Sequence, residues 1–571
     1  MARAVHAKLA TNFLRNTVST MRKTVLLLSL TLLSSRLWGK EQKLASDLKL
    51  DNSSELVNVI VQFNQAPGDK HKNKILAKGG SVDSDLSIVK AVSGKMPKNR
   101  LQELANDPDV AYISPDRAVH SFLNNTATAI NAPISWNQGF DGTGIGIAVL
   151  DSGTQDVVDL TDANKKNRIV YKKSYISGNT GTADVYGHGI HVAGIIAGNG
   201  SSLKGVYIGI APNAKVLDLR VLDDNGQGQD SYVISAIQAA ISLQRTYNIR
   251  VMNLSLGRPV YESYTLDPLC QAVEQAWKAG IVVVAAAGND GRNNSAGTYG
   301  YSTITAPGND PYVITVGAMK SMGTPTRSDD LIASYSSKGP TLIDQIVKPD
   351  IVAPGNIVTS LYGKSATLLG QTYPQNIVQK LYFKLSGTSM AAAVVSGAVA
   401  DLLQAQPSLT PDQVKARLMK TAYKVFPRYS SVTEPATGIT YTDQYDMFTI
   451  GAGYLDLQAA LASTELAPSG VAAKSPKVQF DSSTQSAYFV ADSSAVWGSS
   501  AVWGSSAVWG SNVFLSSSSA VWGSSAVWGS SAVWGSSGTK GFSAVWGSSA
   551  VWGSSTTNAT EAFSVAINGE N

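Results

Sequence analysis

The chain has very few cysteine residues for its length. Cys270 is the single cysteine among 571 residues, so no disulfide can form within the chain and no cysteine-based zinc site is available. It lies in the helical pattern LDPLCQAVEQAWKAG, where we expect a buried apolar thiol. Charged residues make up only 15% of the sequence, and the formal net charge is +5. Lysine and arginine form no long run, so the sequence does not favour nucleic-acid binding.

The sequence offers no clear membrane anchor. The segment MRKTVLLLSLTLLSSRLWGK, which begins at Met21, has a basic start, an apolar stretch, and then small and polar residues. The apolar stretch is shorter than the about 20 residues that a membrane-spanning helix needs, and Ser and Thr interrupt it. The order is typical of a signal peptide. We predict a signal peptide over residues 1–39, with Met21 as a candidate start, and a secreted or cell-surface protein.

The length and the 43% hydrophobic content predict two or three folded domains. Residues 40–125 show the order strand, helix, two strands, helix, strand, which is typical of a ferredoxin-like α+β domain. In residues 126–465, Val/Ile/Ala-rich strand patterns alternate with helical patterns, which predicts an α/β domain with a mostly parallel sheet and helices on both faces. An exposed, cleavable connector, HSFLNNTATAINAP, joins the two.

Residues 466–571 form a repetitive region rich in Ser, Gly and Trp. It holds eight copies of AVWG, most of them in AVWGSS repeats. A short β-solenoid, a stack of hairpins and a largely disordered segment all fit this composition. The region offers no nucleophile, base or metal-binding cluster.

Histidine is scarce as well, which narrows the search for a general base. Of the five histidines, only His188 and His191 lie within the predicted α/β domain. His188 stands between two glycines at the start of a helical pattern, so its ring can project into a cleft. His191 lies within the first turn, where a packed structural role is expected. Asp151 ends the strand pattern GIAVLD at the carboxyl edge of the sheet, although an aspartate there can also serve only a turn.

Two further residues carry side chains that suit acyl-transfer chemistry. Ser389 opens the helical pattern MAAAVVSGAVADLL, where it is either a helix cap or a nucleophile close to backbone N–H groups. Asn289 follows the strand pattern VVVAAAG and carries an amide donor, although a turn asparagine is the alternative. The strand end NLSLG, residues 253–257, offers a backbone edge for pairing with another chain.

These segments together resemble the subtilisin-like serine proteases. VLDSG, GHGIHVAG, NLSLG, AAAGN, KPDIVAPG and SGTSMA match the family's motifs in order, over roughly residues 130–465. The resemblance implies an Asp–His–Ser triad of Asp151, His188 and Ser389, with Asn289 as the oxyanion-hole donor. It also implies substrate contacts from Ser255, Leu256, Gly257, Ala286 and Ala287.

The resemblance also implies how the protein is made and what it acts on. Residues 40–125 would be a propeptide that inhibits the protease until the precursor cleaves itself. The chemistry would need no cofactor, a structural Ca²⁺ ion remains an option, and the metal ligands stay unknown. We therefore expect a secreted serine endopeptidase that acts on proteins or peptides. The alternative is a catalytically weak or inactive relative that serves as a surface binding module. An esterase-type hydrolase is disfavoured because Ser389 lacks the Gly-x-Ser-x-Gly context.

Overall fold

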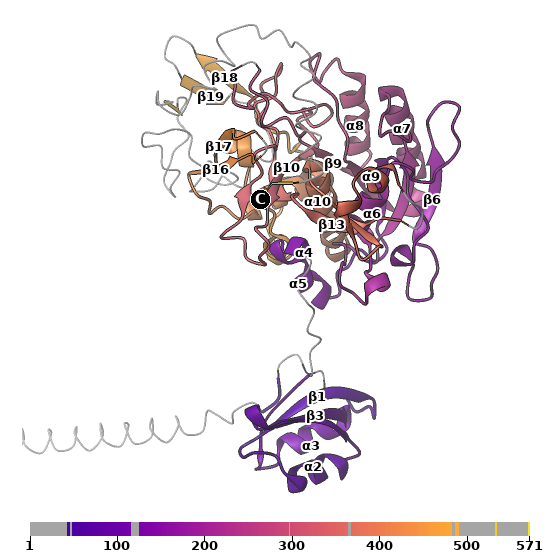
Figure 1. Ribbon diagram of the computed structural model, residues 1–571, viewed down its shortest axis with the longest axis vertical. Helices are drawn as coiled ribbons and strands as arrows, with labels where there is room; N and C mark the ends of the chain where they lie inside the picture. The colour runs from indigo at the N-terminus through magenta and orange to yellow at the C-terminus, as the bar shows by residue number, and fades with distance from the viewer. Residues whose placement is uncertain are drawn as a thin grey trace, which may run out of the picture. The chain divides into compact units, whose positions relative to one another are not determined.

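The computed structural model describes residues 43–45, 48, 50–115, 125–295, 297–363, 367–435, 437–481, 486–489, 532–533 and 569–570. The chain divides into two compact units, residues 1–119 and residues 120–571 (Figure 1). The predicted signal peptide and nearly all of the AVWG copies lie outside the described residues.

The amino-terminal unit has the element order that its sequence predicts. β1 (Leu56–Phe63) lies between β3 (Ala91–Pro97) and β4 (Val110–Pro115), β2 (Ser81–Leu86) flanks β3, and the paired strands are antiparallel. The helices are α2 (Asp69–Leu76) and α3 (Leu101–Ala105). Burial alternates along the second half of β1, where Val59, Val61 and Phe63 face the core. The result is a βαββαβ unit with its own hydrophobic core.

The second unit is built on the mostly parallel sheet that the sequence predicts. Its strands run in the order β11-β10-β9-β8-β5-β7-β6, with β12 also paired to β10, and only the β10–β11 pair is antiparallel. The strands are β5 (Gly146–Asp151), β6 (Ile169–Ser174), β7 (Lys215–Arg220), β8 (Ile249–Leu254), β9 (Val282–Ala286), β10 (Ile314–Lys320), β11 (Leu331–Ile332) and β12 (Ile351–Pro354).

Four helices cover this sheet in two pairs. α6 (His188–Ala197) packs against α10 (Thr388–Ala405), and α7 (Asp230–Tyr247) packs against α8 (Pro268–Lys278) (Figure 1). The other helices of the unit are α4 (Asn125–Ala129), α5 (Ala132–Asn137), α9 (Leu368–Thr372), α11 (Pro411–Thr421), α12 (Met447–Ile450) and α13 (Leu457–Ala462). Short sheets are formed by β13 (Val358–Leu361), β14 (Ile377–Val378) and β15 (Tyr382–Leu385), by β16 (Tyr429–Thr433) and β17 (Thr440–Gln444), and by β18 (Val478–Asp481), β19 (Ser486–Phe489) and β20 (Ala532–Val533).

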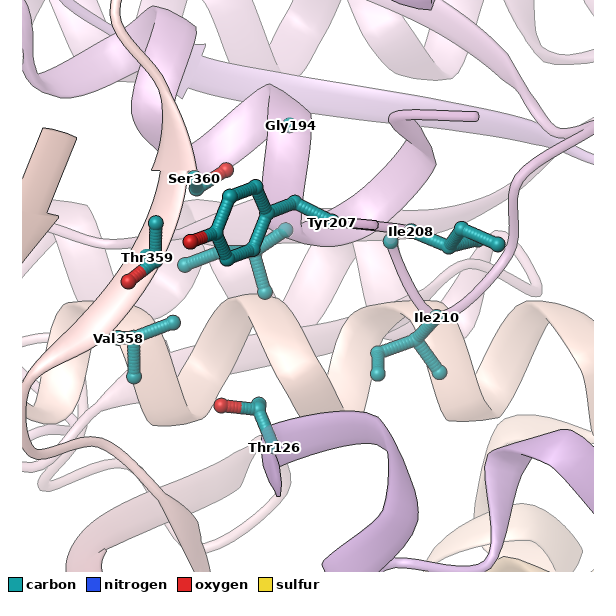
Figure 2. A pocket seen from close by; sticks show the side chains of 10 residues that line it. Thr126, Gly194, Tyr207, Ile208, Ile210, Val358, Thr359 and Ser360 are labelled. Atoms are coloured by element: carbon teal, nitrogen blue, oxygen red, sulfur yellow. The ribbon is translucent and has the colours of Figure 1, made fainter. Parts of the chain in front are cut away.

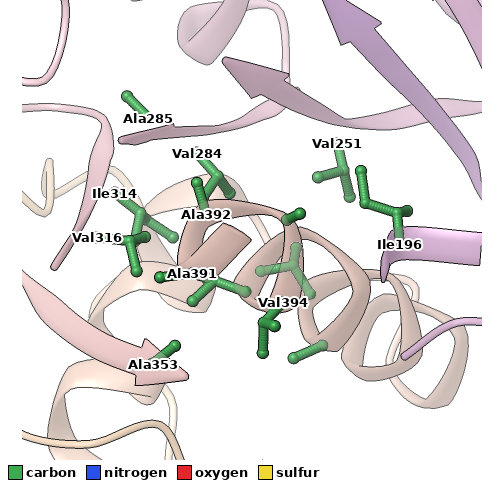
Figure 3. Packing of buried hydrophobic residues seen from close by; sticks show 14 of the residues in the cluster. Ile196, Val251, Val284, Ala285, Ile314, Val316, Ala353, Ala391, Ala392 and Val394 are labelled. Carbon is green, nitrogen blue, oxygen red and sulfur yellow. The ribbon is translucent and has the colours of Figure 1, made fainter. Parts of the chain in front are cut away.

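α10 is the central helix of the core. Its small residues Ala391 and Ala392 let the helix lie close to the sheet, where Val284 of β9 and Val316 of β10 face it (Figure 3). Among the described residues, α10 is also the one helix that is long and apolar enough to cross a membrane, but 83% of it is buried inside the protein. Its apolar character is therefore explained by its place in the core.

Local sequence signals in this unit agree with the structure. α11 begins after the cap Thr410, whose side chain accepts from the Gln413 N–H while the Gln413 side chain accepts from the Thr410 N–H. Cys270 is fully buried on α8, as expected. The core continues past residue 465, where we expected the α/β domain to end, because Ala473 and Val478 are buried in it.

Candidate active site

The predicted site residues follow three neighbouring strands. Asp151 ends β5, Ser255 follows β8, and Asn289 comes soon after β9. β5, β8 and β9 are adjacent and parallel, so their carboxyl ends meet at one edge of the sheet. α10 brings its first turn, with Ser389, to the same edge, since Ser389 contacts Ser255.

Asp151 and His188 form a direct hydrogen bond. The Nδ1 atom of His188 lies 2.7 Å from Oδ1 of Asp151. The carboxylate is almost completely buried, and the same oxygen accepts from the Ser152 N–H at 2.8 Å. The His188 ring is only partly buried. A fixed, buried carboxylate thus orients an imidazole whose other nitrogen, Nε2, remains available for proton transfer.

Glycine is required on both sides of His188. Gly187 has φ +107°, which favours glycine, and a Cβ there would lie 2.6 Å from the Thr367 hydroxyl oxygen. A Cβ on Gly189 would lie 2.2 Å from the Gly153 carbonyl oxygen. The loop after Asp151 can approach the start of α6 this closely only because position 189 lacks a side chain.

Asp184, which the sequence analysis did not single out, holds the start of α6. Its Oδ1 accepts from the Gly187 N–H at 2.7 Å and from the Ser152 hydroxyl at 2.9 Å, and its Oδ2 accepts from the Ile190 N–H at 2.8 Å. Burial is the main cause that raises its pKa, to about 6, although these hydrogen bonds act in the opposite direction. An aspartate in a loop before a helix looks like a turn residue, so the sequence carried no separate signal for this role.

The two histidines of α6 have opposite pKa shifts. Burial lowers the pKa of His188, but the charge and hydrogen bond of Asp151, with the charge of Asp184, raise it overall above its usual value. Burial lowers the pKa of His191 to about 3. Nε2 of His191 lies 3.1 Å and 3.0 Å from two backbone carbonyl oxygens, and the ring is fully buried. The predicted structural role of His191 is therefore confirmed.

Ser389 lies in the first turn of α10 and is partly exposed. Its hydroxyl donates to the Ser255 carbonyl oxygen at 3.1 Å, and the Ser255 hydroxyl donates to the Ser389 carbonyl oxygen at 2.8 Å. Among the described residues, the Ser389 hydroxyl makes no hydrogen bond to His188. Catalytic hydrogen bonds are often long in a free enzyme and tighten when substrate binds, so this geometry does not argue against proton transfer between the two.

The Asn289 side chain is held in place through its Oδ1 atom, which leaves its amide nitrogen available to donate a hydrogen bond. Its Oδ1 accepts from the Thr388 N–H at 2.9 Å and from the Thr388 hydroxyl at 3.2 Å. The Thr388 hydroxyl oxygen also accepts from the Gly288 N–H at 3.1 Å. Within the described part of the chain, Nδ2 of Asn289 donates no hydrogen bond, and it lies beside Gly387, where a Cβ would be 3.2 Å away. Thr388, which the sequence analysis also missed, thus fixes the amide.

The predicted substrate-contact residues differ in whether their main-chain N–H and C=O groups are already hydrogen-bonded. Among the described residues, the main chains of Leu256 and Gly257 make no backbone hydrogen bond. A Cβ on Gly257 would lie 2.5 Å from the Thr305 hydroxyl oxygen, so glycine lets Thr305 pack there. Ala286 and Ala287 are buried, and the main chain of Ala287 is bonded on both sides, to Val316 and Thr305.

The pocket in Figure 2 is separate from these residues. It is lined by residues of α6 and β13 and by Tyr207, and its volume is about 10 Å³. A volume of that size holds about one water molecule, so it is too small for a peptide side chain. Within the described ranges, no group of three or more His, Cys, Asp or Glu side chains could hold a metal ion.

Comparisons with known proteins identify the family of the chain. The model of the subtilase family matches residues 142–453. The chain is 33% identical to subtilisin E of Bacillus subtilis (strain 168) over 401 residues, which cover 70% of this chain and 92% of that protein. It is also 33% identical to serine protease AprX of the same strain over 385 residues, 65% of this chain and 84% of that protein. M-protease of Shouchella clausii (strain KSM-K16) is 31% identical over 444 residues, 76% of this chain and 97% of that protein.

Proposed function

Because this chain belongs to the subtilase family of serine-type endopeptidases, we propose that Asp151, His188 and Ser389 cleave peptide bonds through an acyl-enzyme. The observation that carries the proposal is the 2.7 Å hydrogen bond between Asp151 and His188, at the sheet edge to which α10 brings Ser389. The three residues are far apart in the sequence, so the proposal depends on the fold and not on local sequence alone.

In the proposed reaction, Nε2 of His188 takes the proton of the Ser389 hydroxyl as the oxygen attacks the peptide carbonyl carbon. Asp151 holds the ring through Nδ1 and stabilises the imidazolium that forms. The imidazolium then protonates the leaving amine, and the carboxyl half of the substrate departs. His188 next deprotonates a water molecule, whose attack on the acyl-enzyme releases the second product and regenerates Ser389.

Asn289 supplies the side-chain donor for the oxyanion of this reaction. Its Oδ1 accepts from Thr388, which leaves the Nδ2 amide beside Gly387. The N–H group of Ser389, in the first turn of α10, is the second proposed donor. Donors that are fixed before the reaction stabilise the developing charge without reorganising.

The substrate pairs with the strand end after β8 in this proposal. The unpaired main chains of Leu256 and Gly257 support it, since an extended peptide can add to such an edge through backbone hydrogen bonds. Ser255, at the start of this edge, is also a proposed substrate contact, since its carbonyl oxygen accepts from the Ser389 hydroxyl and has a second lone pair for a substrate N–H. Specificity would then come from pockets that flank this edge.

We also propose that the protein is exported and made as a precursor. The signal-peptide pattern before residue 40 supports export. The compact βαββαβ unit that ends at β4 supports a separate amino-terminal propeptide. The expected exposed connector is wrong for its second half, because residues 125–133 form α4 and the start of α5 and Ala127, Ala129, Ile130 and Ala132 are buried in the core. The proposed chemistry uses no cofactor. A structural Ca²⁺ ion, which the family resemblance implies as an option, takes no part in this chemistry.

The test is the full chain with Ser389→Ala. Loss of a nucleophilic serine costs about 10⁶-fold in kcat in a subtilisin, so hydrolysis of a peptide anilide should become undetectable. Labelling by a fluorophosphonate should disappear as well. The control is Ser235→Ala, since Ser235 is an exposed helix serine whose hydroxyl donates only within its own helix.

Removal of residues 40–125 is measured in the same samples. In a host that lacks other extracellular proteases, the Ser389→Ala chain should retain residues 40–125, whereas the wild type and the control should lose them through a cut between Ser121 and Pro133. A Ser389→Ala chain with its amino terminus in that connector would refute self-processing. Residual labelling of that variant would refute Ser389 as the nucleophile.

A further inference from the structure

Glu570, close to the carboxyl-terminal end of the sequence, is buried in the catalytic unit. It is only 4% exposed. Its side chain is completely buried. A buried carboxylate is costly unless ionic and hydrogen-bonding partners compensate for the loss of water. The surroundings of Glu570 therefore have to form a site for it.

Two cations and one serine surround the Glu570 carboxylate. Arg292 Nη2 lies 2.8 Å from Oε1, and Lys320 Nζ lies 3.3 Å from Oε2. Both cationic side chains are about 5% exposed. The Ser334 N–H donates to Oε1 at 2.9 Å, and the Ser334 hydroxyl donates to the same oxygen. Arg292 is in turn paired with Glu434 at 2.7 Å. The set supplies two positive charges and directs its hydrogen bonds to Oε1, while, among the described residues, Oε2 faces the Lys320 charge without a hydrogen bond.

The main chain of the same segment is held as well. The Asn356 side chain donates to the Glu570 carbonyl oxygen at 2.7 Å and accepts from the Glu570 N–H at 2.9 Å. Gly569 has φ +71°, and a Cβ there would lie 2.5 Å from Ile357 and 2.7 Å from the Ser386 hydroxyl oxygen. Any other residue would clash and would be strained. The contacts thus select glycine followed by glutamate.

The site adjoins the segment that leads into the nucleophile helix. The Ser386 hydroxyl accepts from the Ile357 N–H at 2.8 Å, and the Gly387 N–H donates to the Gly355 carbonyl oxygen at 2.8 Å. Ser386 lies three residues before Ser389 in the chain. The docked end of the chain therefore touches the strand-to-helix turn that presents the nucleophile.

We propose that Arg292, Lys320, Ser334 and Asn356 form a binding site for a Gly–Glu unit, and that Gly569–Glu570 of the same chain occupies it. This anchor tethers the carboxyl-terminal region at both ends to one unit. At the other end, the Val347 N–H donates to the Pro476 carbonyl at 2.8 Å and the Val478 N–H to the Gln345 carbonyl at 2.9 Å. The described residues on either side of the AVWG copies, Pro476, Val478 and Glu570, thus bind to the same unit.

Hydrogen exchange on the full chain tests the anchor, with Ser389→Ala as the background in every sample to prevent self-digestion. Glu570→Gln keeps the shape and removes the charge, and Glu570→Ala removes the side chain. The matched control is Glu465→Gln, which removes an ion pair with Lys420 from a side chain that is 53% exposed. We expect exchange of the Ser334 amide to rise about 10–100-fold with Glu570→Ala, the range for one charge-assisted hydrogen bond. The control should leave it unchanged.

Binding in trans tests the site itself. The probe is a synthetic peptide of residues 561–571, EAFSVAINGEN. It should bind the Glu570→Ala chain, in which the site is vacated, and not the chain with its own Glu570. A peptide with glutamine at the position of Glu570 should bind neither. Unchanged exchange of the Ser334 amide, or equal binding of the probe to both chains, would overturn the proposal. None of these readouts uses catalysis, so their failure would leave the proposed peptidase mechanism standing.

Discussion

Replacing Asn289 by alanine should slow turnover without abolishing it. The substitution removes the Nδ2 donor that we assign to the oxyanion. Removal of the corresponding donor in a subtilisin costs about 10²–10³ in kcat, equivalent to about 2.7–4 kcal/mol of transition-state stabilisation, and we expect a loss in this range. KM should change little, because the developing oxyanion gains more from the donor than the substrate carbonyl does.

The same substitution also has a structural cost, which has to be separated from the catalytic one. Oδ1 of Asn289 accepts from the N–H and from the hydroxyl of Thr388, a residue that is fully buried. Leaving a buried donor without a partner costs about 1–3 kcal/mol of folding free energy. Asn289→Asp is the matched variant, since it keeps an acceptor for Thr388 but offers no donor and adds a negative charge. Asn289→Asp should therefore be more stable to unfolding than Asn289→Ala, and its kcat should be lower than that of Asn289→Ala.

The assay is kcat and KM on a peptide anilide, normalised to active sites by fluorophosphonate titration. Stability is measured as thermal unfolding in the Ser389→Ala background. If Asn289→Ala has the wild-type kcat per active site, Asn289 does not bind the oxyanion. If Asn289→Asp retains activity while Asn289→Ala loses it, Asn289 acts only by holding Thr388. Its Nδ2 group then does not stabilise the oxyanion.

Three further outcomes follow from the site and the repeat region. His188 must be neutral to accept a proton and its pKa is raised, so kcat/KM should fall as the pH drops, with a midpoint above about 6.5; a profile flat down to about pH 4 would exclude a histidine base. Asp184→Asn removes one of the negative charges that raise this pKa, so a pH profile of that variant should show the midpoint at lower pH. Deleting Ser493 to Ser555, which contain the AVWG copies, should leave hydrolysis of a small peptide by the secreted enzyme within a few-fold. A truncated protein that is folded and secreted but inactive would show that this stretch completes the site.

The strands, helix starts and site residues that carry a local sequence pattern could be predicted from the sequence. β1 was bounded correctly because apolar residues alternate through LVNVIVQF, and the start of α11 because Thr410 and Gln413 form a capping box. The parallel sheet followed from continuous Val/Ile/Ala strands separated by helices. Asp151, His188, Ser389 and Asn289 could be chosen because each stands at the end of a strand or the start of a helix, and because their motifs occur in the family's order.

The supporting contacts could not be predicted, because they join segments with no local relation. Asp184 is separated from Ser152 by 32 positions, and Thr388 from Asn289 by 99. Glu570 reaches Arg292 across 278 positions. A single sequence shows that these residues are polar. It does not show that the fold buries them against specific donors, and burial is what gives them their roles.

The two histidines of α6 show how far the surroundings decide chemistry. They are three positions apart on one helix, and the structure gives each a different environment. His188 lies at the helix start, against a buried carboxylate that stabilises its charged form; His191 lies one turn further, against two carbonyl oxygens in the core, where burial disfavours the charge. A base for this reaction has to take up a proton and release it near neutral pH. With its pKa at about 3, His191 cannot do so. The negative charges of Asp151 and Asp184 raise the pKa of His188 instead, which is why we propose His188 as the base.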